Sequence, residues 1–197
     1  MDKPIIYLAT QNQHKVKELL SMFGEQFFIK SIAELPIEEE IPETGSTLAE
    51  NSMQKAKYIA DRFGVTCLAD DSGLEVEALN GAPGVYSARY AGIPKNDQAN
   101  LELLLKNMEG RDNRKARFVT VLTYYSKGEF VQFEGMVEGI ICKEARGTEG
   151  FGYDPIFVPE NDHRTFAEMD LLTKNLFAHR ARAFKKFAKF VDETFVC

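Results

Sequence analysis

The sequence predicts an α/β fold in which a mixed β-sheet is flanked by helices. Three observations lead to this prediction. Short apolar runs typical of strands alternate along the chain with segments whose apolar residues recur at helical spacing. A hairpin signal in the second half indicates that some strands are antiparallel. A length of 197 residues suits one sizeable domain, or two lobes that share a cleft.

The first strand and helix are expected near the start of the chain. Ile5–Ala9 is a short apolar run typical of a buried strand. The helix after it is indicated by four apolar residues at helical spacing, namely Val16, Leu19, Leu20 and Phe23. Gly24 is suited to end that helix, and a second strand is expected near Phe27–Ile32.

The next helix carries its own start and stop signals. Thr47 and Glu50 have the spacing of a capping box, and Gly64 follows the last apolar residue of the pattern. We expect Val65–Ala69 to form a strand that ends at a pair of carboxylates. Alternation of apolar and acidic residues over 74–78 indicates a further strand.

The second half of the chain is expected to hold a helix, a hairpin, another strand and a long closing helix. The first helix is predicted over Asp97–Met108. The hairpin is predicted from two strand-like runs, 117–125 and 130–134, around a Ser-Lys-Gly-Glu turn. A strand is expected over Met136–Cys142, and the last helix over Asn175–Thr194.

Composition and charge exclude several classes of function. A net charge of −6 gives no basic surface for duplex nucleic acid. No apolar run approaches the roughly 20 residues of a membrane span, and no signal peptide opens the chain. Cys67, Cys142 and Cys197 lack the spacing of a zinc site and are odd in number, which favours a reducing, cytoplasmic location over a disulfide framework.

The first candidate site is the segment Thr10-Gln11-Asn12-Gln13-His14-Lys15, where a strand passes directly into a helix. A helix N-terminus presents unpaired N–H groups and partial positive charge, which suit a phosphate. Thr10 and Asn12 can add hydrogen bonds, and Lys15 adds a full charge. The alternative is a polar helix cap with a solvated lysine.

The second candidate site is the pair Asp70-Asp71, followed by Ser72 and Gly73. Two adjacent carboxylates are costly unless a cation or a donor lies near them. Neighbouring strand residues point to opposite faces, so we expect only one of the two to face the site. One or two carboxylates beside a triphosphate suffice for Mg²⁺. The alternative is an acidic turn, since Asp, Ser and Gly form turns readily.

The third candidate site is the glycine-rich segment Gly147–Pro155, which contains Phe151 and Tyr153. Its glycines let the backbone approach a ligand, and an aromatic ring can lie flat on a base. Asp154 precedes a proline, and we expect that position to be extended. The alternative is a tight loop with core aromatics.

The fourth candidate site is Lys174 with His179 and Arg180. On one ideal helix these side chains do not share a stripe, because they lie about 100–140° apart. They can converge if Lys174 precedes the helix and the other two lie in its first turns. The alternative is a polar face on the last helix.

Taken in order along nearly the whole chain, these segments resemble the inosine triphosphate pyrophosphatases, also called non-canonical purine NTP pyrophosphatases or RdgB-like proteins. The most specific stretches are Ala69–Leu74, Gly81–Tyr90 and Gly150–Pro155. The middle stretch, Gly-Ala-Pro-Gly-Val-Tyr-Ser-Ala-Arg-Tyr, carries no chemistry that the residues alone reveal.

The resemblance implies a hydrolase that converts ITP, dITP and XTP to the monophosphate and pyrophosphate and so removes them from the nucleotide pool. It implies one pyrophosphatase domain over residues 1–197, with a long central mixed sheet and two lobes around an active-site cleft. It also implies a homodimer with no nucleic-acid or membrane partner. Departures from the family are Glu149, where glycine is common, and Ala178, where serine is common.

The resemblance also implies residue roles. Glu43 and Asp71 would bind Mg²⁺, and Asp71 would act as the base toward water. The triphosphate would be contacted by Thr10, Asn12, Lys15, Lys55 and Ser72. The neighbouring residues of the first segment, Gln11, Gln13 and His14, would also belong to the substrate-binding site. The base would be enclosed by Phe151, Gly152, Tyr153, Asp154, Lys174, His179 and Arg180.

Base selectivity follows from hydrogen-bond chemistry. Hypoxanthine and xanthine carry a 6-oxo acceptor, so a donor from Arg180 or Lys174 would disfavour adenine, whose 6-amino group is itself a donor. Guanine shares the 6-oxo group and must be rejected at its 2-amino group, by a residue that the sequence does not identify.

Two rival functions stay open. Maf-like nucleotide pyrophosphatases open with a serine- and arginine-rich phosphate loop, which this chain lacks. A nucleotide sensor without catalysis would be free to lose Glu43 and Asp71, whereas both are present here.

Overall fold

The computed structural model describes residues 5–23, 27–39 and 41–195. It contains a six-stranded sheet in the order β2-β1-β3-β4-β5-β6. The strands are β1 (Ile5–Ala9), β2 (Phe28–Ser31), β3 (Cys67–Val76), β4 (Lys115–Ser126), β5 (Glu129–Ile141) and β6 (Phe157–Pro159). The α-helices are α1 (Gln13–Met22), α2 (Leu48–Phe63), α3 (Asp97–Asn107), α4 (Leu171–Asn175) and α5 (His179–Phe195). β1 is parallel to both β2 and β3, whereas β6 is antiparallel to β5, so the sheet is mixed.

The chain divides into two compact units. The first contains residues 1–71, 120–135 and 180–197, and the second contains residues 72–119 and 136–179. β3, β4 and β5 each contribute residues to both units. Among the described residues, no helix is long and apolar enough to cross a membrane.

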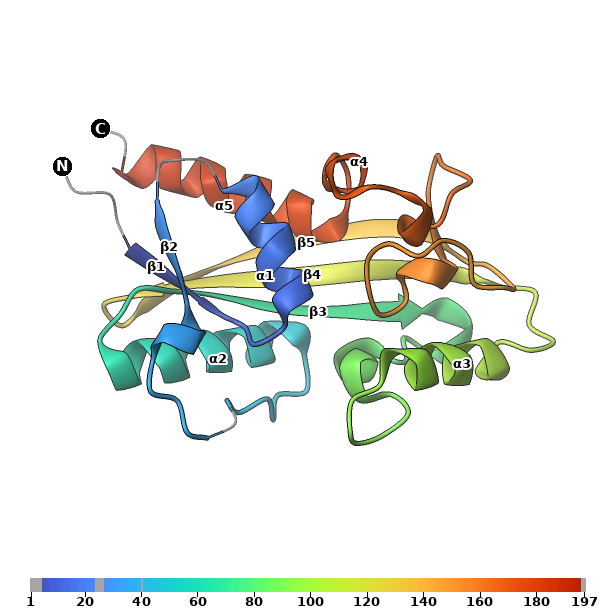
Figure 1. Cartoon of the computed structure of the whole chain (residues 1–197), viewed down its shortest axis with the longest axis horizontal. Coiled ribbons are helices and arrows are strands. Elements are labelled where there is room, and N and C mark those ends of the chain that lie inside the picture. Colours follow the sequence, from blue (N-terminus) through green and yellow to red (C-terminus); the bar gives the residue numbers. More distant parts are fainter. Residues whose placement is uncertain (1–4, 24–26, 40, 196–197) are drawn as a thin grey trace. The chain divides into compact units, whose positions relative to one another are not determined.

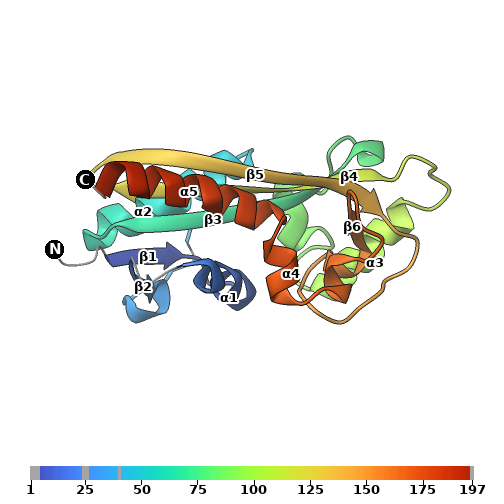
Figure 2. The same ribbon diagram turned by 90° about the horizontal axis from the view of Figure 1, so that it is seen from above.

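In the first unit, helices cover both faces of the sheet (Figures 1 and 2). On one face, Leu8 and Leu68 pack with apolar residues of α1 and α5, such as Leu19 and Phe187. On the other face, the neighbours of these strand residues pack against α2 in a separate cluster. That cluster includes Ala9, Ala56, Ile59, Cys67, Ala69 and Tyr125. The alternation along β1 and β3 therefore assigns α1 and α5 to one face and α2 to the other.

The second unit has its own apolar core, built on the far halves of the same strands. Val76, Phe118 and Ile141 contribute from the strands, and Leu104 contributes from α3. Phe157 packs edge-on against Phe118, with 4.7 Å between the ring centroids. This core includes Tyr153 of the third candidate site and Ala178, which precedes His179 of the fourth.

The predicted fold class is confirmed, and so are the elements with local signals. Thr47 and Glu50 form the capping box at the start of α2, and Gly64 ends that helix in the left-handed conformation at φ 65°. The hairpin turns at Lys127 and Gly128, both with positive φ, as a two-residue turn requires. Gly24, the predicted stop of the first helix, lies outside the described residues.

Three boundaries were wrong. β3 does not end at the carboxylate pair but continues through Asp70 and Asp71, because each carboxylate is paired with a cation. The runs 130–134 and 136–142 form the single strand β5. The closing helix begins at His179 and not at Asn175, so Lys174 precedes it, in α4, while His179 and Arg180 lie in its first turn, as the fourth candidate site requires.

Candidate active site

The two adjacent carboxylates of β3 serve opposite faces of the sheet, as the pleat requires. Asp70 faces the side of α1 and α5 and is fully buried. Its Oδ1 lies 2.7 Å from Nζ of Lys15, and its Oδ2 accepts a 2.7 Å hydrogen bond from Nε of Arg180. Burial alone would raise the pKa of Asp70, but Arg180 and Lys15 outweigh it and hold that pKa well below its usual range. Asp70 is therefore ionised.

Asp71 faces the side of α2 and meets Lys55. The Lys55 ammonium lies 2.7 Å from Oδ1 of Asp71 and 2.8 Å from Oε1 of Glu43. It also donates a 2.9 Å hydrogen bond to the backbone carbonyl of Asp70. Burial would lower the pKa of Lys55, but the charges of Asp71 and Glu43 reverse the effect and raise it. The structure thus brings together Glu43, Lys55 and Asp71, three residues with predicted roles.

The segment Thr10–Lys15 forms the polar helix cap that was its alternative interpretation, at the start of α1. Its role in binding phosphate stays a prediction. Oδ1 of Asn12 accepts the N–H groups of His14 and Lys15, at 2.9 and 3.3 Å. Thr10 is buried and accepts the N–H of Asn12 at 3.2 Å. Gln11, Gln13 and His14 are exposed. Lys15 is not the solvated lysine of that alternative, since its side chain is only 13% exposed.

Arg180 is the largest buried charged residue of the first unit and has two carboxylate partners. Besides Asp70, its guanidinium donates to Glu18 of α1. Burial opposes the charge on Arg180, but Asp70 and then Glu18 outweigh it and raise its pKa. The predicted contact of Arg180 with the base stays a prediction, and the observed contacts assign it to a buried ion-pair network with Glu18, Asp70 and Lys15.

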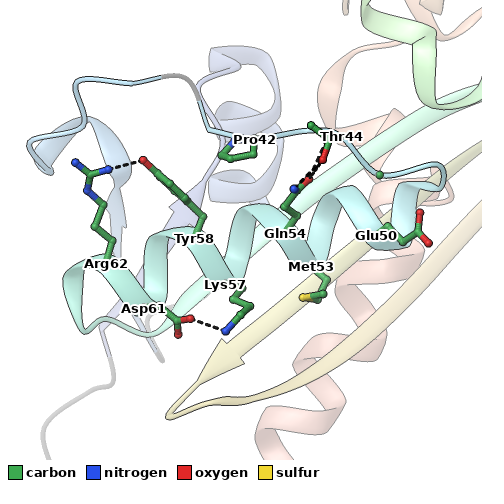
Figure 3. Close-up of a pocket in the computed structure, with 10 residues that line it drawn as sticks. Pro42, Thr44, Glu50, Met53, Gln54, Lys57, Tyr58, Asp61 and Arg62 are labelled. Atoms are coloured by element: carbon green, nitrogen blue, oxygen red, sulfur yellow. Dashed lines mark hydrogen bonds and ion pairs between the residues drawn. The ribbon is translucent and has the colours of Figure 1, made fainter.

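Glu43 is held in place by side chains at the start of α2. Asn51 accepts the N–H of Gly45 at 2.7 Å, and Gln54 accepts the N–H of Thr44 at 2.9 Å. Figure 3 shows the Gln54–Thr44 bonds at the wall of a pocket of about 750 Å³ on the outer side of α2. The lining of this pocket includes none of the predicted site residues.

In the second unit, Asp154 and Lys174 form a buried ion pair. Nζ of Lys174 lies 2.6 Å from Oδ2 of Asp154, and both side chains are 3% exposed. The same carboxylate oxygen accepts the N–H of Phe151 at 3.0 Å. The Lys174 ammonium lies 5.3 Å from the centroid of the Phe151 ring, a cation–π distance. The predicted extended geometry of Asp154 was wrong, since it opens a 3₁₀ turn, Asp154–Ile156.

The two aromatics of the glycine-rich loop have different environments. Phe151 is half-buried, and the Lys174 ammonium lies over its ring. Tyr153 is buried in the core, and its hydroxyl donates to the carbonyl of Ser87 at 2.9 Å. Gly152 donates its N–H to Asp97 at 3.0 Å. The stacking of Phe151 on a base stays a prediction, whereas Tyr153 fits the alternative of a core aromatic.

His179 and Ser72 complete the predicted residues in the second unit. His179 is buried and stacks on Phe118, with ring centroids 4.7 Å apart and an interplanar angle of 11°. Ser72 follows Asp71 in β3 and is half-buried.

Sequence reasoning missed the function of Ser87 in the Gly81–Tyr90 stretch. Its hydroxyl accepts the N–H of Leu74 and donates to the carbonyl of Gly84, at 2.9 and 2.6 Å. A Cβ on Gly73 would lie 2.4 Å from that carbonyl, which explains why glycine stands there. The Pro-Gly-Val-Tyr-Ser motif thus packs against β3 through contacts that no spacing in the sequence reveals. Glu18 was missed as well, because nothing local marks it as a buried residue.

The metal that the family resemblance implies, Mg²⁺, needs oxygen ligands. Among the residues that the structure describes, no three Asp, Glu, His or Cys side chains gather to hold an ion by themselves. Glu43 and Asp71 do direct carboxylate oxygens to one point, the Lys55 ammonium. Mg²⁺ needs only one or two protein carboxylates when waters and phosphate supply the rest. The residues therefore fit Mg²⁺.

Comparison with known proteins identifies relatives that match almost the whole chain. Residues 6–190 match the model of the Ham1 family. A dITP/XTP pyrophosphatase of Christiangramia forsetii is 46% identical over 95% of this chain and 99% of its own length. One from Bacillus subtilis is 45% identical over 94% of this chain and 96% of its own length. Among solved structures, the Ham1 protein of Staphylococcus aureus is 40% identical, with a TM-score of 0.87 over 96% of this chain and 98% of its own.

Proposed function

The chain belongs to the Ham1 family, and on that premise we propose that it hydrolyses non-canonical purine nucleoside triphosphates to the monophosphate and pyrophosphate. The observation that carries the proposal is the likeness, over almost the whole chain, to relatives that bear the name dITP/XTP pyrophosphatase. ITP, dITP and XTP are the proposed substrates. The protein is thus a hydrolase that removes these nucleotides from the pool.

For the phosphate end of the substrate, the first unit supplies two cations beside two carboxylates. We propose Mg²⁺ as the cofactor, held by Glu43 and Asp71, where it would neutralise phosphate charge and ease the departure of pyrophosphate. Asp71 accepts the proton of the water that attacks the α-phosphorus. The bond from that phosphorus to the oxygen of pyrophosphate breaks, and Lys15 stabilises the charge on the phosphate oxygens.

For the purine base, the second unit supplies the ring of Phe151 and the ammonium of Lys174, which Asp154 holds in place. Phe151 stacks on the purine, and Lys174 donates to its 6-oxo group while Asp154 fixes the ammonium. A 6-amino group would leave that buried donor unpaired, which disfavours ATP. We also propose, as predicted from the sequence, that Arg180 takes part in recognition of the base. The observation that supports Lys174 is its burial against Phe151 and Asp154.

The proposal is tested by incubating the protein with Mg²⁺ and, separately, ITP, XTP, dTTP, ATP or GTP. Release of pyrophosphate from ITP and XTP is expected, with much less from the others. Preference for dTTP would favour the Maf-like function, and orthophosphate in place of pyrophosphate would contradict the proposed bond cleavage. Binding of ITP without any hydrolysis would identify a sensor.

Replacing Asp71 with Asn keeps the size of the side chain but removes the proton acceptor and a metal ligand. We expect kcat for ITP to fall by about 10²-fold or more. Stopped-time assays of pyrophosphate measure the loss, and circular dichroism checks that the variant folds. A folded variant with near wild-type turnover would remove Asp71 from the mechanism.

We also propose a homodimer and a cytoplasmic location, the latter because the substrates are cytoplasmic nucleotides. Support for the dimer is the family resemblance alone. Sedimentation equilibrium at micromolar concentration measures the mass, and a monomer would contradict this part of the proposal.

A further inference from the structure

The Lys55 ammonium makes three polar contacts, and these match its full capacity as a donor. An ammonium has three N–H groups and no acceptor. Its acceptors here are Oε1 of Glu43, Oδ1 of Asp71 and the carbonyl of Asp70, at 2.8, 2.7 and 2.9 Å. The side chain is 6% exposed. With these contacts made, Lys55 has no donor left for a phosphate oxygen.

Two of these three acceptors are the carboxylates that we assign to the metal. A divalent cation and the ammonium compete for the same oxygens, since both are held by negative charge and lone pairs at short range. The two cations repel each other as well when they occupy neighbouring positions. In the metal-free protein, Lys55 therefore holds the carboxylates of Glu43 and Asp71 close together. It also weakens the binding of a metal ion to those carboxylates.

We propose that metal binding displaces Lys55 from Glu43 and Asp71, and that the released ammonium becomes the contact for substrate phosphate. The inference rests on the proposed function, and it adds an order of events to it. Lys55 is a built-in counter-ion before the metal binds and a phosphate ligand afterwards. Metal binding and phosphate binding are coupled through this one side chain.

The test measures binding of Mn²⁺ to the free protein, without nucleotide, by electron paramagnetic resonance. Mn²⁺ takes the same oxygen ligands as Mg²⁺. In Lys55→Met the competing charge is gone, and we expect the Kd for Mn²⁺ to fall by about tenfold or more. The same variant should lose kcat/KM for ITP, because the phosphate contact is lost with the ammonium. Tighter metal binding together with lower activity is the signature of the exchange.

Lys57→Met is the matched control. It removes an equal charge two residues along α2, about 200° around the helix, where Lys57 pairs with Asp61 on the outer side (Figure 3). Its affinity for Mn²⁺ should equal that of the wild type. If Lys55→Met does not fold, Lys55→Gln, which keeps a polar end, is measured instead.

A Kd for Mn²⁺ that is unchanged or higher in the Lys55 variant overturns the exchange. Thermal unfolding gives a second readout, since added Mg²⁺ should raise the Tm of the variant more than that of the wild type. Pyrophosphate release by the wild-type protein is assayed in parallel. A wild type that hydrolyses ITP while the Lys55 variant gains no metal affinity refutes the exchange and leaves the proposed function standing.

Discussion

Lys15 and Lys55 approach the same backbone oxygen, the carbonyl of Asp70, from opposite faces of β3. The distances are 3.4 Å from Nζ of Lys15 and 2.9 Å from Nζ of Lys55. Burial and then the neighbouring cations Lys55 and Arg180 lower the pKa of Lys15, although Asp70 and Asp71 oppose them. The pKa of Lys55 is raised, because Asp71 and Glu43 outweigh its burial. As the pH rises, Lys15 should therefore lose its proton before Lys55 does.

Lys15 must carry its proton to bind phosphate, so a lowered pKa means that the competent form is lost at lower pH than for an ordinary lysine. We expect the alkaline decline of kcat/KM for ITP, which reports the free enzyme, to begin at a lower pH than an ordinary lysine would give. In Lys15→Arg the charge persists, and the decline should move to higher pH. Both proteins are assayed with the same nucleotide, so titration of the base cancels. If kcat/KM declined over the same alkaline pH range in the wild type and in Lys15→Arg, Lys15 would not control the pH profile.

Replacing Arg180 with Met leaves Asp70 and Glu18 buried without their shared cation. We expect the free energy of unfolding to fall by about 3–5 kcal/mol, as for a broken buried ion pair. Urea denaturation measures it. Arg182→Met is the control, since Arg182 is exposed on the same helix and surface changes stay within about 0.5 kcal/mol. Equal stability of the two variants would contradict the structural role of Arg180.

Helix α2 positions two residues of the candidate site, Lys55 and Glu43. Its inner face carries Lys55 to the carboxylates, and its first turns hold the loop that carries Glu43. Gln54 makes a pair of bonds to Thr44, through the N–H at 2.9 Å and the hydroxyl at 3.0 Å. Gln54 is thus a positioning residue for Glu43.

Gln54→Leu should loosen the loop of Glu43 and weaken binding of Mn²⁺ to the free protein by about tenfold, the lower end for residues that orient a metal ligand. Circular dichroism should show little change in helix content. The control is Gln98→Leu, which removes a comparable exposed bond to Glu102 on α3. An effect of equal size in both variants would mean that the loss is not specific to the loop.

The elements predicted well are those whose signals are local. The capping box at Thr47 and the stop at Gly64 need only neighbours along the chain. The path of β3 through Asp70 and Asp71 could not be predicted, because Lys15 and Arg180 come from 55 and 110 residues away. Without those cations, two adjacent carboxylates indicate the end of a strand.

The first helix shows the same limit. Leu20 was assigned to its apolar face but is 47% exposed, whereas Glu18 on the same helix is 5% exposed. Burial of Glu18 depends on Arg180, which lies 162 residues further along the chain. Helical periodicity locates the helix correctly but is blind to a buried ion pair. Of the candidate site, Glu43 and Lys55 were identified through the resemblance alone, whereas Asp71 already belonged to a candidate site that the residues themselves indicate. Their mutual contacts came from the structure.

At the scale of the whole molecule, the two units share strands instead of being joined by linkers. β3, β4 and β5 pass through both. Unfolding either unit alone would break strands in the middle, so we expect one cooperative transition. Differential scanning calorimetry should give a calorimetric enthalpy equal to the van't Hoff enthalpy, the latter calculated for a dimer that dissociates as it unfolds. Two resolved transitions would show that the units unfold independently.

The pleat of β3 also limits how the gene can change in length. Asp70 and Asp71 reach different cations only because consecutive side chains point to opposite faces. Deleting one codon earlier in the strand would exchange their faces and send each carboxylate to the wrong partners. A codon substitution changes one side chain but leaves the alternation of faces along the strand intact. An insertion at the Lys127–Gly128 turn lies outside β3 and leaves that alternation intact as well. We therefore expect related genes to vary in length at that turn and in loops, while the number of codons between Cys67 and Asp71 stays constant.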